Sequence, residues 1–274
     1  MEYEPPSLGA PDQIGRFVMR SLAAPTPQGG QFTDVADVYD SLMSGVPYAE
    51  WLTYVEQLWE LMDLTPRRIL DLACGTANVT TEFVQAGYDV EGLDNSAAML
   101  ERARRKLPYV PFHLSDAAEF QLDRPLFDAC VCLFDSLNYL LTPERLRSSF
   151  ECVRRHLAPG GSFLFDLNTV YALRSGMFNQ RGHGVDSALE FRWSSRWDEE
   201  SLLCTIEMEF FHHREVGTRI VRETHIQRGF PIPELESLLR DAGFQVLGIY
   251  DGFTFRTPRA RSDRIHILAV NPAS

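Results

Sequence analysis

ILDLACGTAN, residues 69–78, is an apolar strand pattern that runs into a turn of small residues and then into a helix. This order exposes backbone N–H groups at the carboxyl end of a strand, where open α/β sheets bind ligands. The next strand pattern, VEGLD, ends at Asp94, roughly twenty residues beyond the turn, where a carboxylate can accept hydrogen bonds from both ribose hydroxyls. The two segments together predict a nucleoside-containing ligand on an α/β sheet.

Strand-like and helical segments alternate on both sides of this stretch. Ser96 and Thr142 stand where N-caps are expected, at the starts of helices over 97–107 and 143–157. A repeating strand–helix order predicts a mainly parallel sheet with helices on both faces. The seven strand candidates are 67–73, 88–94, 109–114, 127–134, 161–167, 244–253 and 264–270.

The alternation breaks between residues 187 and 230, where three long strand patterns cover 188–197, 201–213 and 218–230. Leu189, Phe191, Trp193 and Trp197 share one face of the first of these strands. A face this aromatic predicts an antiparallel insertion that covers another part of the molecule.

Composition narrows the class of protein. The chain has 274 residues, 45% of them hydrophobic and 23% charged, as in an ordinary soluble globular protein. Its net charge of −12 would repel a phosphate backbone, so nucleic acid is not an expected partner. No segment has the roughly 20 apolar residues that a membrane span needs, and the N-terminus lacks a signal-peptide pattern, so we expect no membrane association and a cytoplasmic location.

No metal site is expected from the cysteines and histidines. The five cysteines are odd in number and lack C-x-x-C spacing, which predicts reduced, buried thiols. His212 and His213 are neighbours on a strand, so their side chains point to opposite sides and cannot hold one ion in the usual way.

The glycines narrow the choice of nucleoside. A dinucleotide fingerprint needs three glycines at G-x-G-x-x-G spacing, and only Gly75 is present here. No Gly-Lys-Ser/Thr follows the turn, which excludes a P-loop. A nucleoside without phosphates is the common ligand that remains.

The order of sequence motifs along the chain resembles that of a known family. DLACGTANVT, GLDNSAAML, Asp116-Ala117, FDACVCLFDSLNYL and LAPGGSFLFDLN follow one another as the motifs of class I S-adenosylmethionine-dependent methyltransferases do, over about residues 66–168. ADVYD with the following Tyr48 and Trp51, and the antiparallel insertion, also resemble the small-molecule branch that includes the sugar N,N-dimethyltransferases of antibiotic biosynthesis.

This resemblance implies S-adenosyl-L-methionine as cofactor and assigns roles along the motifs. Asp71, Cys74 and Gly75 would shape the methionine pocket, and Asp94 would hold the ribose. Asp116 with Ala117 would meet the adenine, Phe134 with Asp135 would line the donor near its sulfonium, and Tyr39 would cover it. The other predicted donor-binding residues are Ala73, Asn95 and Met99. Ala77 stands where the family usually has a second glycine.

The predicted function is methyl transfer to a small-molecule acceptor, an amine or a hydroxyl, by direct in-line displacement. An amine could lose its proton to solvent before binding, whereas a hydroxyl would need a base such as His225, Asp135 or Tyr139. Two alternatives stay open: a non-catalytic S-adenosylmethionine-binding or regulatory module, and a nicotinamide-dependent oxidoreductase, which the missing glycines disfavour.

We expect a monomer or homodimer built from four parts. Residues 1–32 form an N-terminal arm and 33–65 a helical lid. Residues 66–182 and 231–274 form the donor-binding domain, with a Rossmann-like seven-stranded sheet whose last strand is antiparallel. Residues 183–230 form the antiparallel β insertion, a roof that covers the acceptor cavity and sets substrate selectivity.

Overall fold

The computed structural model describes residues 39–40, 43–123, 126–183, 189–213 and 217–273. The predicted arm at 1–32 and the start of the predicted lid lie outside the described residues. The helices are α2 (Tyr48–Leu61), α3 (Asn78–Gln85), α4 (Ala97–Lys106), α5 (Pro143–His156), α6 (Val170–Arg174) and α7 (Ile232–Asp241), with the 3₁₀ helix η1 (Ser136–Tyr139). The strands are β1 (Arg68–Leu72), β2 (Asp89–Asp94), β3 (Phe112–Leu114), β4 (Phe127–Cys132), β5 (Leu157–Asn168), β6 (Gln180–His183), β7 (Leu189–Asp198), β8 (Leu203–His213), β9 (Thr218–Arg228), β10 (Gln245–Asp251) and β11 (Arg264–Val270).

The central sheet confirms the predicted fold class. Its seven strands lie in the order β10-β11-β5-β4-β1-β2-β3. Strands β1 to β5 pair in parallel, while β11 pairs antiparallel with both β5 and β10. The carboxyl ends of β1, β2 and β4 therefore lie together at one edge of the sheet.

Local sequence signals set the ends of the helices. The Ser96 hydroxyl accepts a hydrogen bond from the Met99 N–H at the start of α4, and the Thr142 hydroxyl accepts one from the Arg145 N–H at the start of α5. Gly87 follows α3 with a φ of +92°, a conformation that glycine adopts without steric cost. Both predicted N-caps are confirmed.

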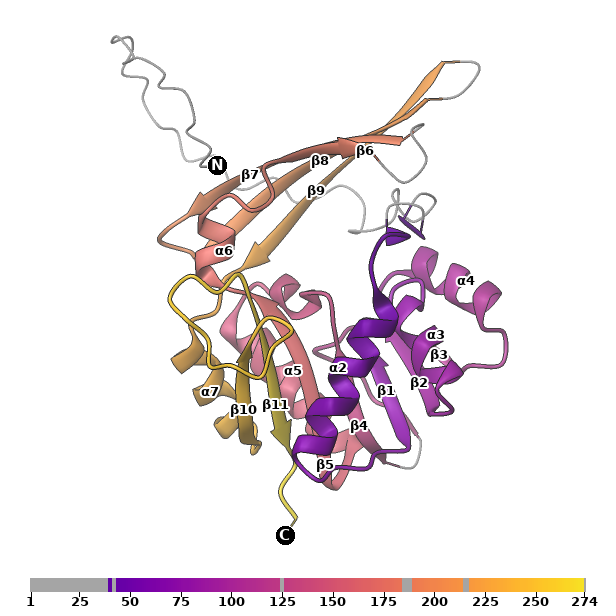
Figure 1. The fold of residues 1–274 in the computed structure, drawn as a ribbon, viewed down its shortest axis with the longest axis vertical. Coiled ribbons are helices and arrows are strands. Elements are labelled where there is room, and N and C mark those ends of the chain that lie inside the picture. Colours follow the sequence, from indigo (N-terminus) through magenta and orange to yellow (C-terminus); the bar gives the residue numbers. More distant parts are fainter. Residues whose placement is uncertain (1–38, 41–42, 124–125, 184–188, 214–216, 274) are drawn as a thin grey trace, which may run out of the picture.

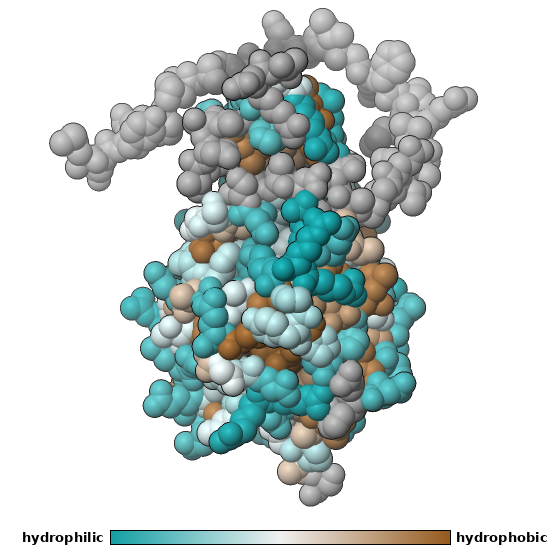
Figure 2. All heavy atoms as spheres, turned by 90° about the vertical axis from the view of Figure 1, so that its right-hand side faces the viewer, coloured by the Kyte–Doolittle hydropathy of each residue, from teal (hydrophilic) through white to brown (hydrophobic). Residues whose placement is uncertain are grey.

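Helices cover both faces of the sheet, as Figure 1 shows. On one face, α5 and α7 pack Phe150, Leu235 and Leu239 into a core with Phe163 and Phe165 of β5. The opposite face is covered by a core that includes residues of α2 and α3. The side of the molecule that carries α4 is mostly hydrophilic (Figure 2), in keeping with the exposed Glu101, Arg104 and Arg105. No described helix is long and apolar enough to cross a membrane.

The insertion is a second sheet of four strands, in the order β6-β7-β8-β9, placed beyond the edge of the central sheet (Figure 1). The sequence predicted the three long strands but not β6, which pairs antiparallel with β7. Strand β6 is the short polar stretch QRGH, which shows no alternation of apolar and polar residues. The insertion therefore begins a few residues before the predicted boundary at 183.

One face of this second sheet is buried. Cys204, Ile206, Met208 and Phe210 of β8 are buried, whereas Glu207 between them is exposed. The predicted alternation of faces in β8 is thus confirmed. Strand β9 differs, because its buried positions include the polar residues His225 and Gln227.

Asn138 of η1 joins the two sheets. Its amide nitrogen donates to the carbonyl oxygens of Asn168 at 3.1 Å and Arg228 at 2.8 Å, and its oxygen accepts from the Asn168 N–H at 2.9 Å. Asn168 ends β5 and Arg228 ends β9, so one buried side chain binds the points where the chain leaves and re-enters the central fold.

Candidate functional site

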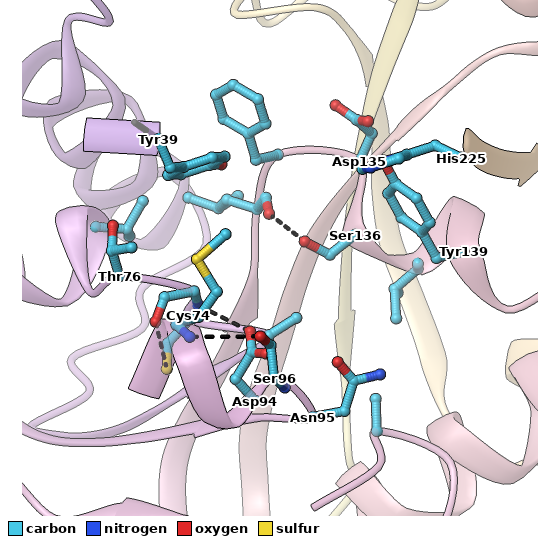
Figure 3. A pocket seen from close by; sticks show the side chains of 18 of the residues that line it. Tyr39, Cys74, Thr76, Asp94, Asn95, Ser96, Asp135, Ser136, Tyr139 and His225 are labelled. Carbon is cyan, nitrogen blue, oxygen red and sulfur yellow. Dashed lines mark hydrogen bonds between the residues drawn. The ribbon is translucent and has the colours of Figure 1, made fainter. Parts of the chain in front are cut away.

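A cavity of about 560 Å³ lies between the carboxyl edge of the central sheet and the β6–β9 sheet (Figure 3). All the residues that the sequence predicted for donor binding line it, and so do the candidate bases. These residues are Tyr39, Asp71, Ala73, Cys74, Gly75, Asp94, Asn95, Met99, Asp116, Ala117, Phe134, Asp135, Tyr139 and His225. The structure thus brings together residues that span 187 positions of the chain, from 39 to 225.

The loop after β1 has an unusual backbone. Ala73, Gly75 and Ala77 all have positive φ, at +59°, +54° and +65°. Non-glycine residues seldom adopt this conformation, and clusters of it occur at functional sites. Ala77 is fully buried in this conformation, so the loop accommodates a methyl group where the family usually has glycine.

Asp94, at the end of β2, holds this loop. One carboxylate oxygen accepts a hydrogen bond from the Gly75 N–H at 2.8 Å, and the other accepts one from the Ser96 N–H at 2.7 Å. Burial raises the pKa of Asp94, and these backbone donors oppose the rise. Each carboxylate oxygen can accept a second hydrogen bond, so Asp94 can still bind hydroxyls in the cavity.

The space beside Gly75 fits a ligand. A Cβ placed on Gly75 would meet no protein atom within 4 Å. The loop therefore presents bare backbone to the cavity, next to the carboxylate of Asp94. Exposed backbone and a carboxylate side by side suit the polar groups of a nucleoside with an amino acid attached, such as S-adenosylmethionine.

Asp71 lies deeper, at the end of β1. It is almost completely buried, and its carboxylate accepts a hydrogen bond from the Thr80 hydroxyl at 2.5 Å. Burial raises the pKa of Asp71 to about 7, although the hydrogen bond from Thr80 opposes the rise. A carboxyl group with this pKa changes its charge in the physiological range.

Asp116 lies at the rim of the same half of the cavity. Its carboxylate accepts from the Ala118 N–H at 2.8 Å and from Arg145 of α5 at 2.7 Å. The Arg145 side chain also lines the cavity. The sequence analysis did not single out Arg145, because only the fold brings α5 beside this loop.

A residue of the predicted lid is bonded to the loop after β1 and to α4. The Asp40 carboxylate accepts from the Thr76 hydroxyl at 2.6 Å and pairs with Lys106 of α4 at 3.2 Å. Its neighbour Tyr39 lies beside Thr76 at one side of the cavity in Figure 3. At Asp40 the predicted lid is therefore bonded to the loop after β1.

Phe134 and Asp135 form a second strained turn, directly after β4, with φ of +69° and +50°. The Asp135 carboxylate accepts from Arg264 at 2.6 Å and from the Gln227 amide at 2.7 Å. Arg264 also pairs with Asp166. Burial raises the pKa of Asp135, and the Arg264 guanidinium opposes the rise.

Arg264 and Gln227 are functional candidates that the sequence analysis missed. Arg264 begins the last strand and lies opposite Asn168 in the sheet register. It directly precedes the strand pattern IHILAV, but Arg256, Arg259 and Arg261 stand close before it, so the sequence did not distinguish it. Gln227 gave only a weak signal, a polar residue that shares its face of β9 with His225.

His225 contacts two partners on opposite sides of its ring. Nδ1 lies 2.9 Å from the Tyr139 hydroxyl, and Nε2 lies 2.7 Å from the Glu223 carboxylate. Figure 3 shows Asp135, Tyr139 and His225 gathered on one side of the cavity, away from Cys74, Asp94 and Ser96. The cavity thus has two polar regions separated by space.

The remaining wall is apolar. Phe178, Trp193, Met208 and Phe210 come from the β6–β9 sheet and the segment before it. The buried Trp193 Nε1–H has no hydrogen-bond partner among the described residues.

Nothing in the described residues resembles a metal centre. They contain no cluster of three or more His, Cys, Asp or Glu side chains that could hold an ion. All five cysteines are free and buried, as predicted.

Comparisons with known proteins decide the family. Residues 69–161 match the model of a methyltransferase domain. The chain is 34% identical over 238 residues to YqeM of Bacillus subtilis, a protein named as a methyltransferase, which covers 85% of this chain and 94% of that one. It is 38% identical over 219 residues, 77% of this chain and 86% of the relative, to dTDP-4-amino-2,3,4,6-tetradeoxy-D-glucose N,N-dimethyltransferase of Saccharopolyspora spinosa.

The chain belongs to the class I S-adenosylmethionine-dependent methyltransferases. Its fold is similar to that of an S-adenosylmethionine-dependent methyltransferase from Clostridium acetobutylicum, with a TM-score of 0.77 and 25% identity over 87% of this chain and 98% of that one. DesVI of Streptomyces venezuelae gives a TM-score of 0.72 and 27% identity over 88% and 99% of the two chains. This methyltransferase is therefore an enzyme that uses S-adenosylmethionine, and the nicotinamide-dependent alternative is set aside.

Proposed function

We propose that this methyltransferase transfers a methyl group to the nitrogen of a small-molecule amine. The observation that carries the proposal is the acidic character of the cavity. Four aspartates and two arginines line it, and each arginine is already paired with carboxylates. Around Arg264 the two carboxylates of Asp135 and Asp166 leave one excess negative charge, which favours a cationic acceptor such as an ammonium.

The donor is proposed to bind in the half of the cavity formed by the β1 and β2 loops. Asp94 accepts the ribose hydroxyls, and the loop from Ala73 to Gly75 with Asp71 surrounds the methionine part. Asp116 and Ala117 meet the adenine, with Asn95 and Met99 beside it. Tyr39, Phe134 and Asp135 face the sulfonium. Bound S-adenosylmethionine supplies a methyl group on a positively charged sulfur, which leaves as a neutral thioether.

The acceptor is proposed to lie under the roof, between the apolar wall and the group formed by Asp135, Tyr139 and His225. An acceptor held there has its nitrogen on the side of the cavity that faces the donor half. In-line displacement needs this alignment, at roughly 3 Å between the reacting atoms, and the exclusion of water. The roof at 183–230 with β6 is thereby the part that selects the acceptor, and 66–182 with 231–274 the part that binds the donor.

The relatives support an amine. Two curated relatives, the enzyme of Saccharopolyspora spinosa and one of Streptomyces venezuelae, are named as N,N-dimethyltransferases of amino sugars. A hydroxyl acceptor is the second candidate, because His225 lies where a base would be needed.

The test is a turnover screen with the full-length protein and S-adenosylmethionine. The acceptors are dTDP-4-amino-2,3,4,6-tetradeoxy-D-glucose, benzylamine, phenol and benzoate, and S-adenosylhomocysteine is measured by mass spectrometry. We expect methylation of amines, with a much lower rate in an Asp94→Asn variant at limiting donor. Methylation of phenol or benzoate without any amine product would overturn the proposal.

A further inference from the structure

Tyr139, His225 and Glu223 form a continuous hydrogen-bonded chain that starts in the acceptor half of the cavity. Tyr139 ends η1 and lines the cavity, while His225 and Glu223 are two residues apart on β9 and so share its inner face. His225 is fully buried, and the Glu223 side chain is 7% exposed. The Tyr139–His225 distance is 2.9 Å and the His225–Glu223 distance is 2.7 Å.

The donors and acceptors in this chain have a fixed direction. An ionised carboxylate only accepts hydrogen bonds, so the Nε2–H of His225 donates to Glu223. In the neutral ring the other nitrogen, Nδ1, then carries a lone pair and accepts the hydrogen bond of the Tyr139 hydroxyl. Burial raises the pKa of Tyr139 and the charge of Asp135 raises it further, while a hydrogen bond with Gln227 opposes the rise, so Tyr139 keeps its proton.

An amine acceptor needs a group in the site that takes up its proton. A free alkylamine has a pKa close to that of lysine, about 10.4, so only about one molecule in 1,000 is neutral at pH 7.4. The protonated majority has no lone pair with which to attack a methyl group. The acidic surroundings of the cavity favour the protonated form, so the acceptor must lose a proton inside the site.

The charged groups around Tyr139 and His225 are compatible with the uptake of a proton by His225. Asp135 faces Tyr139 from the turn after β4, and Tyr39 faces it from the lid. Arg264 of β11 is paired with Asp135 and Asp166, so it does not add an unpaired positive charge beside the histidine. An imidazolium at His225 would lie against the carboxylate of Glu223.

We propose that Tyr139 and His225 relay a proton out of the bound ammonium of the acceptor, and that Glu223 is the positioning residue that fixes the tautomer of His225. The ammonium gives its proton to the Tyr139 oxygen as the Tyr139 hydroxyl proton passes to His225 Nδ1. The freed nitrogen lone pair then forms the bond to the methyl carbon, and the electron pair of the carbon–sulfur bond goes to sulfur. After the product leaves, the imidazolium returns its proton through the Tyr139 hydroxyl to water in the open cavity, because His225 itself is fully buried. This relay rests on the proposed amine acceptor.

The first test measures the tautomer in the full-length protein without any substrate. Nitrogen NMR of ¹⁵N-histidine-labelled protein distinguishes protonated from unprotonated ring nitrogens, and a His225→Asn variant identifies the signals. We expect His225 with a proton on Nε2 and none on Nδ1. We also expect Glu223→Gln to weaken this preference, and Glu207→Gln, on the outer face of the roof, to leave it unchanged.

Two outcomes of this measurement would overturn the relay. A proton on Nδ1 in the wild-type protein would leave Tyr139 without a proton acceptor. An unchanged tautomer in Glu223→Gln would remove Glu223 from the positioning role.

The second test is the pH profile of turnover between pH 7 and 9, with whichever amine in the acceptor screen is methylated fastest. Wild-type kcat/KM should be nearly flat, because the enzyme takes up the proton. Tyr139→Phe should lower kcat/KM at pH 7 by about 10²-fold or more, with a rise of about tenfold per pH unit as the free base of the amine accumulates. A merely structural defect would not follow the amine in this way.

Tyr171→Phe is the matched control, since Tyr171 lies on α6 with its side chain partly in solvent. It should behave as the wild type does. If the wild type methylates amines and Tyr139→Phe does so equally well at pH 7, the relay is wrong while the proposed function stands. If the wild type methylates no amine, both fail.

Discussion

Asp71 should make the stability of this methyltransferase depend on pH in a direction opposite to that of most carboxylates. Burial raises the pKa of Asp71 to about 7 in the native state, whereas an aspartate in an unfolded chain titrates at about 3.9. The native state therefore holds this proton more tightly. The stabilising contribution is fully present below about pH 4 and is lost as the pH rises towards 7.

The difference of about three pKa units corresponds to about 4 kcal/mol above pH 7, since one unit is worth about 1.4 kcal/mol. Roughly 2 kcal/mol of this develops between pH 5 and 7. Asp71→Asn removes the titration and keeps an oxygen that can accept the hydrogen bond from Thr80. The free energy of unfolding of Asp71→Asn, minus that of the wild type, should thus increase by about 2 kcal/mol over this range.

Urea unfolding of both proteins at pH 5, 6 and 7, without donor, gives this difference directly. Titrating groups that do not interact with Asp71 contribute equally in both proteins and cancel in this difference, whereas the nearby Asp94 does interact with it. Glu91, for example, has its pKa lowered by hydrogen bonds from His113 and Arg68, and so follows the usual trend in both proteins. A difference that stays constant from pH 5 to 7 would refute the reasoning, because the native carboxyl would then titrate as it does in the unfolded chain.

Donor binding should respond to the same carboxyl group. If Asp71 faces the ammonium of the methionine part, binding favours the ionised form. The affinity for S-adenosylhomocysteine should then fall up to about tenfold for each pH unit below 7 and level off above it. Calorimetry should find no such dependence in Asp71→Asn.

Three further changes separate the two halves of the cavity. Asp94→Asn should weaken the binding of S-adenosylhomocysteine by 1.5–3 kcal/mol, roughly 13- to 160-fold, in calorimetry on protein whose fold is checked by circular dichroism. Its melting temperature should also fall, because the amide oxygen can accept from only one of the Gly75 and Ser96 N–H groups, and an unchanged affinity would remove Asp94 from the ribose role. Trp193→Ala should raise the KM for the acceptor about tenfold or more while donor affinity stays near that of the wild type, and Trp197→Ala, outside the cavity lining, is its control. Asp40→Asn should speed donor release by about twofold to fivefold in stopped-flow fluorescence, because the bond to Lys106 is partly exposed; a slower release would contradict the lid contact.

That the residues of the β1 and β2 loops line one cavity could be predicted from the sequence because the determinants are local. The turn after β1, the carboxylate that ends β2 and the two N-caps all lie within short, continuous stretches. The roof strands were predictable for the same reason, since alternation over ten or more residues of β7 and β8 reports one buried face. Strand β6 was missed because four residues carry no such pattern.

The partners of Asp135 and His225 on the other side of the cavity could not be derived in this way. Arg264 meets Asp135 across 129 positions of the chain, and Gln227 meets it across 92. Glu223 is a single charged residue in a strand that also contains exposed charges, so nothing in the sequence marks it as the partner of His225. Only the folded register of β9 beside η1 brings these groups together.

The three hydrogen bonds of Asn138, two with Asn168 and one with Arg228, have a consequence for how such enzymes diversify. The chain leaves the central fold at Asn168 and returns to it at Arg228, and the Asn138 amide binds both points. The stretch between them can therefore be exchanged as one unit, a cassette. Exchange of that cassette between relatives, with Asn138 and both junctions retained, should pass on a new acceptor preference while leaving the machinery for the methyl donor intact. Evolution could in this way sample substrates without redesigning the chemistry.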